Sequence, residues 1–464
     1  MTHVRSLSEY QAAGVLTTDV LNQFHQKFFA DSRNVFAQNV CARYSPLEVC
    51  ISRKTLQETQ HVFTNKIEVE GKPVTNQKKS GRCWIFSALN VIRTVFMKQY
   101  NLDDFEFSQA YLFFWDKVER CNHFLHTIVK TAKQNEPADG RLVQFLLSDP
   151  ICDGGQWDMI VNLINRHGLV PKTSFPDSHN SENTARMNVI LKSKLREYAK
   201  VLRDLVSNGA SDEAIQSEIL EQMTIIYRII GICLGVPNET ITWEYYDKSK
   251  TYNCIGPITP LEFYIKYVKP HYNVDDKVCL VTDPRPTSPY GQLYTIDCLG
   301  NVVGGRPVLY NNQPPEVLMK LCADSIKQNE PVWFGCDVTK KISSKYGIQD
   351  LKVLDMESVF GTDIHVKLSK ADRLLYGDSM MGHAMTFTAV SVDENGEIKK
   401  FRVENSWGED HGQKGYLVLT ADWFSEFVFE VVIDKKLISK EIMDVFNKEP
   451  VVLPAWDPMG TLAH

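Results

Sequence analysis

The segment NQKKSGRCWIFSALN, residues 76–90, places a cysteine between a polar loop and a strongly apolar run. From Cys83 onward the apolar residues occupy nearly every position, which predicts a helix buried almost all round with Cys83 in its first turn. The first turn of a helix carries unpaired N–H groups and a partial positive charge. These favour a thiolate, so we expect the pKa of Cys83 to be lowered. A cysteine in this position is either a nucleophile or a small packing residue.

A possible oxyanion hole lies just upstream. Gln77 precedes Cys83 by six residues, and Ser80-Gly81 permits close approach of a ligand to the backbone. The Gln77 side-chain amide and the Cys83 backbone N–H are suited to donate together to a developing oxyanion.

A nucleophile needs a base, and His383 is the candidate. It opens the predicted strand HAMTFTAVSV (383–392), which is followed by the turn signal DENG (393–396) and a second strand ending at Asn405. His383 and Asn405 are symmetric about the turn, so we expect them to be neighbours on adjacent strands unless the register slips. An Asn carbonyl can then fix the imidazole tautomer, and Trp407 can shield that hydrogen bond from water.

Each of these residues also has a simpler interpretation. A single strand-end histidine is more often bonded to backbone, and Asn405 alone is typical of a turn. The combination of Gln77, Cys83, His383 and Asn405 favours a Cys-His-Asn catalytic triad.

The composition narrows the class of protein. The 464 residues are 43% hydrophobic and 23% charged, as in globular proteins, and no apolar run is long enough to span a membrane. The N-terminal residues do not resemble a signal peptide. A net charge of -6 gives no support for nucleic-acid binding.

The cysteine pattern and the absence of other motifs narrow the class of protein further. Eleven cysteines, an odd number with no C-x-x-C pair, argue against a disulfide framework or a zinc site and favour a reducing compartment. No phosphate-binding loop, dinucleotide fingerprint or HExxH sequence occurs, so we expect no cofactor and no metal. Asp283-Pro284-Arg285-Pro286 is interpreted as a rigid loop.

Several motifs together resemble papain-like cysteine peptidases. QKKSGRCWIFS (77–87), GHAMTFTAV (382–390) and VENSWGEDHGQKGYLVL (403–419) are similar to the Cys, His and Asn-Ser-Trp-Gly segments of that superfamily. Further segments, including FEFSQAYLFFWDKVER (105–120), DGGQWDM (153–159) and the tail LPAWDPMGTLA (453–463), resemble the bleomycin hydrolase family over nearly the whole chain.

The resemblance implies roles for individual residues. Cys83 is the expected nucleophile, His383 the general acid and base, Asn405 its orienter and Gln77 part of the oxyanion hole. Gly154-Gly155 resembles the strip that holds substrate backbone. The family implies a cytoplasmic homohexamer with active sites facing an internal channel.

The resemblance also implies an aminopeptidase that works through a thioester acyl-enzyme. The same enzyme is expected to hydrolyse an amide of bleomycin, and this hydrolysis inactivates the compound. The C-terminal tail is expected in the cleft, where its carboxylate takes the amino group of the substrate. Two features depart from the family. Lys78, Lys79 and Arg82 add positive charge near the nucleophile, and the chain ends in His464, so that Ala463 presents the carboxylate if the last residue is trimmed.

The expected architecture is α+β, a two-lobed papain-like fold with a helical lobe, an antiparallel β lobe, a helical insertion and a C-terminal tail. Five parts are expected: an extension packed on the catalytic core (1–70), a helical lobe with the nucleophile (71–180), a helical insertion with connecting segments (181–330), a β lobe with His and Asn (331–450) and the tail in the cleft (451–464). Two amphipathic helices are expected in the insertion, broken at Asn208-Gly209.

Three rival functions remain open. An endopeptidase with an open cleft would cut blocked peptides, whereas a tail-gated aminopeptidase would not. A non-catalytic assembly protein with a relic triad is disfavoured because all four catalytic residue types are present. An acyltransferase on the same plan differs only in whether water reaches the thioester.

Overall fold

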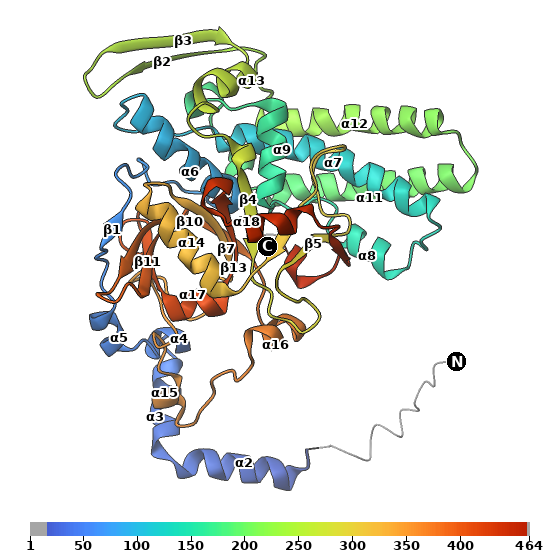
Figure 1. Cartoon of the computed structure of the whole chain (residues 1–464). Coiled ribbons are helices and arrows are strands. Elements are labelled where there is room, and N and C mark those ends of the chain that lie inside the picture. Colours follow the sequence, from blue (N-terminus) through green and yellow to red (C-terminus); the bar gives the residue numbers. More distant parts are fainter. Residues whose placement is uncertain (1–15, 462–464) are drawn as a thin grey trace. The chain divides into compact units, whose positions relative to one another are not determined.

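The computed structural model describes residues 16–461, which divide into two compact units. The first unit combines the chain up to Glu58 with Leu351–Lys367, and the second contains Thr59–Asp350 and the chain from Leu368 onward. Figure 1 shows the chain coloured along the sequence.

The first unit is built from short helices. They are α2 (Thr18–Ala30), α3 (Ser32–Cys41), α4 (Pro46–Val49), α5 (Arg53–Glu58) and α15 (Met356–Phe360). The Thr17 and Asp31 side chains cap α2 and α3 by accepting from backbone N–H groups. Neither of these two helices buries a residue. Backbone hydrogen bonds from Ser52 to Val353 and from Asp355 to Cys50 join the two segments of the unit.

The second unit contains twelve α-helices among the described residues. They are α6 (Cys83–Gln99), α7 (Gln109–Lys133), α8 (Arg141–Ser148), α9 (Trp157–His167), α10 (His179–Glu182), α11 (Ala185–Ser207), α12 (Asp212–Leu234), α13 (Pro260–Phe263), α14 (Pro315–Lys327), α16 (Lys370–Leu375), α17 (Ala421–Phe427) and α18 (Lys440–Met443). Helix α6 is buried nearly all round, as predicted, with only Val95, Lys98 and Gln99 not buried. Among residues 16–461, no helix is both long and apolar enough to cross a membrane.

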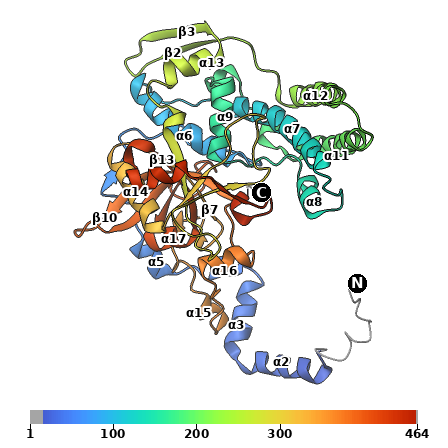
Figure 2. The same ribbon diagram turned by 45° about the vertical axis from the view of Figure 1, so that its right-hand side comes forward.

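The predicted pair of insertion helices is confirmed. Helix α11 ends at Ser207, Gly209 takes a left-handed conformation (φ +71°), and the Ser211 hydroxyl caps α12 by accepting from the Ala214 N–H. Both helices pack beside α7 (Figures 1 and 2).

A mixed sheet of twelve strands forms the core of the second unit, in the order β14-β5-β6-β4-β13-β7-β10-β11-β12-β9-β8, with β1 added on β10. The strands are β1 (Asn65–Lys66), β4 (Lys277–Val281), β5 (Gln292–Ile296), β6 (Tyr310–Asn312), β7 (Val332–Cys336), β8 (Ile342–Ser343), β9 (Ile348–Gln349), β10 (His383–Val392), β11 (Ile398–Glu404), β12 (Tyr416–Thr420), β13 (Val428–Asp434) and β14 (Val451–Leu453). A separate hairpin joins β2 (Ile241–Tyr246) and β3 (Tyr252–Ile258).

The α+β fold expected from the sequence is therefore present, with most neighbouring strands antiparallel. The sheet also takes β4, β5 and β6 from residues 277–312, where the sequence analysis expects only insertion and connecting segments. Strand β4 is buried at all five positions, so its sequence shows no alternation of polar and apolar residues.

The hairpin of β10 and β11 differs in register from its predicted form. A hairpin symmetric about the turn would place Thr386 opposite Arg402, whereas Thr386 pairs with Glu404 and two irregularities follow along the ladder. The shift at Thr386 is an even number of residues, so the side chains keep their faces. On its other edge, His383 pairs with Cys336 of β7.

Helix α6 is fixed to this hairpin by buried polar contacts. The Ser87 hydroxyl donates to the Met385 carbonyl (2.6 Å). The Arg93 guanidinium pairs with the Glu404 carboxylate (Nη2 to Oε1, 2.6 Å), and both side chains are almost fully buried. Arg93 also donates to the Pro73 carbonyl (2.9 Å), so one side chain joins the helix, the hairpin and the preceding loop.

We predict that Arg93→Met lowers the free energy of unfolding by about 3–5 kcal/mol, because it leaves the buried Glu404 carboxyl without its partner. Urea unfolding measures this. Lys98→Met is the control, since Lys98 lies on the same helix and pairs with Glu68 in solvent; we expect it to cost less than about 1 kcal/mol. Equal losses in the two variants would show that the buried pair does not hold the helix to the sheet.

Candidate active site

The candidate nucleophile begins helix α6, as predicted, and only 2% of Cys83 is exposed. Burial raises the pKa of its thiol to about 11, although backbone N–H groups of Ala384, Trp84 and Cys83 act in the opposite direction. The expectation of a lowered pKa is therefore wrong for this conformation. The N–H groups at the helix start stabilise the thiolate, but burial removes its hydration and destabilises it by more.

The predicted contact between His383 and Asn405 is confirmed. The ring Nε2–H donates to Asn405 Oδ1 (2.9 Å), and the same oxygen accepts from the Ser406 backbone N–H (2.7 Å). Two donors on one atom fix the amide orientation, so Nδ1 of His383 is left without a proton in the neutral ring. Burial lowers the pKa of His383 to about 4, with the Asn405 hydrogen bond opposing that shift.

Trp407 lies beside the histidine, as the sequence analysis expects of a shielding residue. Its ring centroid is 4.9 Å from that of His383, and the two planes are tilted by 34°. An indole at this distance limits the access of water to the imidazole.

Gln77 is held by the Asn-Ser-Trp-Gly segment. Its backbone N–H donates to the Ser406 carbonyl (2.8 Å), and the Ser406 hydroxyl donates to Gln77 Oε1 (2.6 Å). Gln77 Nε2 donates to the Ser80 carbonyl (2.6 Å), which uses one of its two N–H groups and leaves the other. Gly408 (φ +81°) packs so closely that a Cβ would lie 2.6 Å from the Asn76 amide.

A small cavity of about 10 Å³ lies between Cys83 and His383. It is lined by Cys83, Gly155, Gln156, Trp333, Gly335, Met381, His383, Ala384 and Thr461. The structure thus brings Cys83, His383 and Gly155 to one cavity, with Asn405 behind the histidine. Gln77 and Gly154 do not line it.

Six of the nine lining residues were not predicted individually: Gln156, Trp333, Gly335, Met381, Ala384 and Thr461. They come from widely separated segments and form no motif. Three of them had a signal in the sequence: Gln156 directly follows Gly154-Gly155, Ala384 directly follows His383, and Thr461 lies in the tail that was expected in the cleft.

The glycine strip is packed directly against the helix that carries Cys83. A Cβ on Gly155 would lie 2.7 Å from the Trp84 ring, so only glycine fits there. The Trp84 indole N–H in turn donates to the Asp153 carbonyl (2.7 Å), and the Asp153 carboxylate pairs with the buried Lys117 ammonium (2.7 Å).

The extra positive charge expected near Cys83 is reduced by pairing. Arg82 is fully buried and pairs with Asp177 (Nη1 to Oδ1, 2.9 Å), and its guanidinium lies over the Phe86 ring. Lys78 and Lys79 are exposed, where water screens their charge.

The described part of the tail, which ends at Thr461, reaches the cavity. The Thr461 carbonyl accepts from Gln156 Nε2 (3.2 Å). Upstream, the Arg285 guanidinium binds both oxygens of Asp457 (3.0 and 2.8 Å) and also pairs with Asp283, so the Asp-Pro-Arg-Pro loop anchors the tail. The expected carboxylate residues, Ala463 and His464, lie outside the described residues.

The depressed pKa of His383 predicts a pH dependence of stability. Between about pH 4 and 6.5, His383 is protonated in the unfolded chain and neutral in the folded protein. Its contribution to the free energy of unfolding is therefore complete above pH 6.5 and is lost as the pH falls through 4. The contribution reaches about 3 kcal/mol. Urea unfolding of wild type and His383→Gln from pH 4 to 7 isolates it as a difference that grows with pH. An NMR titration of His383 with a pKa at or above 6.5 would contradict the prediction.

Comparisons with known proteins identify the family of the chain. Residues 15–460 match the model of the peptidase C1-like family. The chain is 55% identical over 450 residues to bleomycin hydrolase of Gallus gallus, covering 97% of this chain and 99% of that protein. It is 41% identical over 404 residues to aminopeptidase C of Listeria monocytogenes, covering 87% and 89% of the two chains.

The fold is also similar to a solved structure. The crystal structure of PepW from Lactobacillus rhamnosis HN001 has a TM-score of 0.92 and 39% sequence identity, covering 97% of this chain and all of that one. The chain therefore belongs to the peptidase C1-like family, has the papain-like fold and is a cysteine peptidase.

Proposed function

We propose that this protein is an aminopeptidase in which Cys83 is the nucleophile, His383 the general acid and base, and Asn405 its orienter. The observation that carries the proposal is the cavity shared by Cys83, His383 and Thr461, with Asn405 bonded to the far side of the imidazole. A nucleophile, a base and a chain segment that limits the cleft thus meet at one point.

The proposed reaction has two stages. The Cys83 proton passes to Nδ1 of His383 while Sγ attacks the scissile carbonyl carbon. The oxyanion accepts from the Cys83 backbone N–H and from the remaining Gln77 amide N–H. His383 then gives its proton to the leaving amine as the C–N bond breaks. Water, deprotonated by His383, cleaves the thioester and restores the thiol.

The directions of the two pKa shifts bear on the charge state of the resting Cys83 and His383 pair. Burial opposes the Cys83 thiolate alone and the His383 imidazolium alone. Formed together, the two charges attract strongly in a site that excludes water. We infer that the resting pair is neutral and becomes charged when substrate completes the site.

The tail supplies the proposed selectivity for amino ends. Thr461 already borders the cavity, so the residues after it are placed to block longer substrates on that side. A carboxylate on Ala463 or His464 would pair with the free amine of the substrate. The name of the bleomycin hydrolase relative extends the proposal to the amide of bleomycin-type compounds. A homohexamer in the cytoplasm is proposed as well, on the family resemblance of the sequence alone.

Matched peptide substrates test the proposal. One set carries a free N-terminal amine and the other the same peptide acetylated. We expect release only from free amines, and none in Cys83→Ser. Equal cleavage of both sets would support an open-cleft endopeptidase instead, and no turnover of either would favour a non-catalytic protein.

The proposed oxyanion hole gives a second prediction. Gln77→Ala removes one donor to the oxyanion, so kcat should fall by about 10²–10³-fold. Gln99→Ala is the control, because Gln99 lies exposed at the end of helix α6. Steady-state kinetics on the free-amine substrate measure both. A Gln77→Ala enzyme within twofold of wild type would remove Gln77 from the mechanism.

A further inference from the structure

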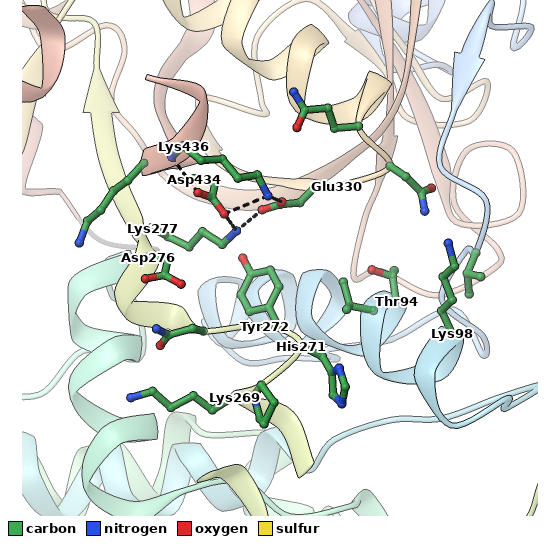
Figure 3. A pocket seen from close by; sticks show the side chains of 17 residues that line it. Thr94, Lys98, Lys269, His271, Tyr272, Asp276, Lys277, Glu330, Asp434 and Lys436 are labelled. Carbon is green, nitrogen blue, oxygen red and sulfur yellow. Dashed lines mark hydrogen bonds and ion pairs between the residues drawn. The ribbon is translucent and has the colours of Figure 1, made fainter. Parts of the chain in front are cut away.

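Figure 3 shows a cavity of about 650 Å³ in the second unit, whose lining charges are bound to groups of the protein itself. The ion pairs are Lys277 and Lys436 with Glu330 and Asp434, Lys269 with Asp275, and Lys98 with Glu68. A different buried network, centred on Asp153, lies next to the candidate active site.

The carboxylate of Asp153 binds four donors from three segments of the chain. Its Oδ1 accepts from the Lys117 ammonium of α7 (2.7 Å) and from the Asn188 amide of α11 (2.8 Å). Its Oδ2 accepts from the Thr184 hydroxyl (2.5 Å) and from the Gly81 backbone N–H (3.3 Å). Burial opposes ionisation, but the Lys117 charge and the side-chain donors hold the pKa of Asp153 well below its usual range.

Asp153 joins the two parts of the candidate site that have to face the same substrate. It directly precedes the glycine strip, and Gly155 borders the catalytic cavity. Gly81 belongs to the loop 77–82, which precedes the candidate nucleophile and carries Gln77. The Asp153 carboxylate therefore ties the strip proposed to hold substrate backbone to the loop proposed to bind the oxyanion.

The loop 77–82 contains a strained residue and is braced by a neighbouring segment. Lys78 has a left-handed conformation (φ +54°), which a non-glycine residue adopts at a cost in free energy. The Lys79 N–H donates to the Glu182 carbonyl (2.9 Å), and the Thr184 N–H donates to the Lys79 carbonyl (3.4 Å). The segment that begins helix α11 is thus bonded directly to the loop.

The Thr184 hydroxyl does not serve the helix that it begins. Thr184 is the N-cap of α11, a position where a threonine side chain ordinarily accepts from an N–H group of the first turn. The Thr184 side chain makes no such capping bond and donates to Asp153 instead. Exceptions of this kind to the local rules of helix formation are expected at functional positions.

We propose that Asp153 and Thr184 are positioning residues that set the distance between the glycine strip and the oxyanion hole. Thr184 acts through Asp153, which holds Gly81 and thereby orients the Gln77 amide and the Cys83 backbone N–H. The start of the helical insertion is on this account a support of the active site. These roles rest on the proposed function of Gln77 and Cys83.

Two substitutions of Thr184 test the proposal in the full-length protein. Thr184→Val removes the hydroxyl and keeps the shape, so kcat on the free-amine substrate should fall about tenfold, with KM changed by less than about twofold. Thr184→Ser keeps the hydroxyl and should stay within about twofold of wild type. Asp153 is left intact, because its removal would leave the buried Lys117 ammonium without this partner.

Thr127→Val is the matched control. Thr127 is also buried, and its hydroxyl donates to the His123 carbonyl of its own helix (2.8 Å). It should leave kcat unchanged. Equal kcat in Thr184→Val and Thr184→Ser would overturn the proposal.

A double-variant cycle separates positioning from a general loss of stability. If Thr184 acts through the oxyanion hole, Thr184→Val should lower kcat by less than about twofold in a Gln77→Ala background. Two independent effects would instead multiply, and that result would also overturn the proposal.

Hydrogen exchange followed by mass spectrometry provides a readout that needs no turnover. Peptides covering 77–82 should exchange about tenfold faster in Thr184→Val than in Thr184→Ser, while peptides from β11 exchange alike in both. Absence of Cys83-dependent turnover in wild type would remove the proposed function, and the exchange would still decide whether Thr184 holds the loop. Unchanged exchange of the loop would show that it does not.

Discussion

The buried ion pair between Arg93 and Glu404 is the contact on which the geometry of the site depends. Arg93 lies on the helix that begins with Cys83, and Glu404 directly precedes Asn405. The candidate nucleophile and the orienter of the candidate base are more than 300 residues apart in sequence, so their alignment requires a rigid connection between helix and strand. A buried pair adds little net stability over an apolar contact. Its directed hydrogen bonds do fix the axial position of the helix against the hairpin, as the Ser87 contact with Met385 does nearly two turns closer to Cys83.

Close packing at this junction has a chemical consequence. The same exclusion of water that raises the pKa of Cys83 and lowers that of His383 also strengthens hydrogen bonds to a developing oxyanion. A more exposed site would favour the thiolate at rest but weaken the proposed donors, the Cys83 N–H and the Gln77 amide. The structure therefore combines a thiol whose pKa is raised by burial with the donors proposed for the oxyanion hole.

Local patterns in the sequence predicted much of this site. The contacts between residues far apart in the sequence could not be predicted in this way. The apolar run after Cys83 predicted the helix. Alternation around a turn predicted the hairpin of His383 and Asn405, although the register differs by two residues at Thr386. Strand β4 was missed because a strand buried on both faces has no period. The neutralisation of Arg82 by Asp177 could not be read from a sequence separation of 95 residues. The pKa of Cys83 was misjudged because the favourable effect of the helix start was considered without the loss of hydration that the predicted burial of the helix brings.

The tail illustrates how a remote contact can define a substrate pocket. Asp457 is held by two hydrogen bonds to Arg285, both side chains being 7% exposed, and the Thr461 carbonyl is held by Gln156. Only Pro458, Met459 and Gly460 separate the two anchors, and they form a short 3₁₀ turn. So little chain between fixed points leaves Thr461 few alternative positions at the border of the cavity. The Asp-Pro-Arg-Pro loop, which contributes no group to the cavity, thereby determines how far the tail extends toward Cys83. If the tail selects amino ends as proposed, the length of the cleft is set by this ion pair as much as by the residues that touch substrate.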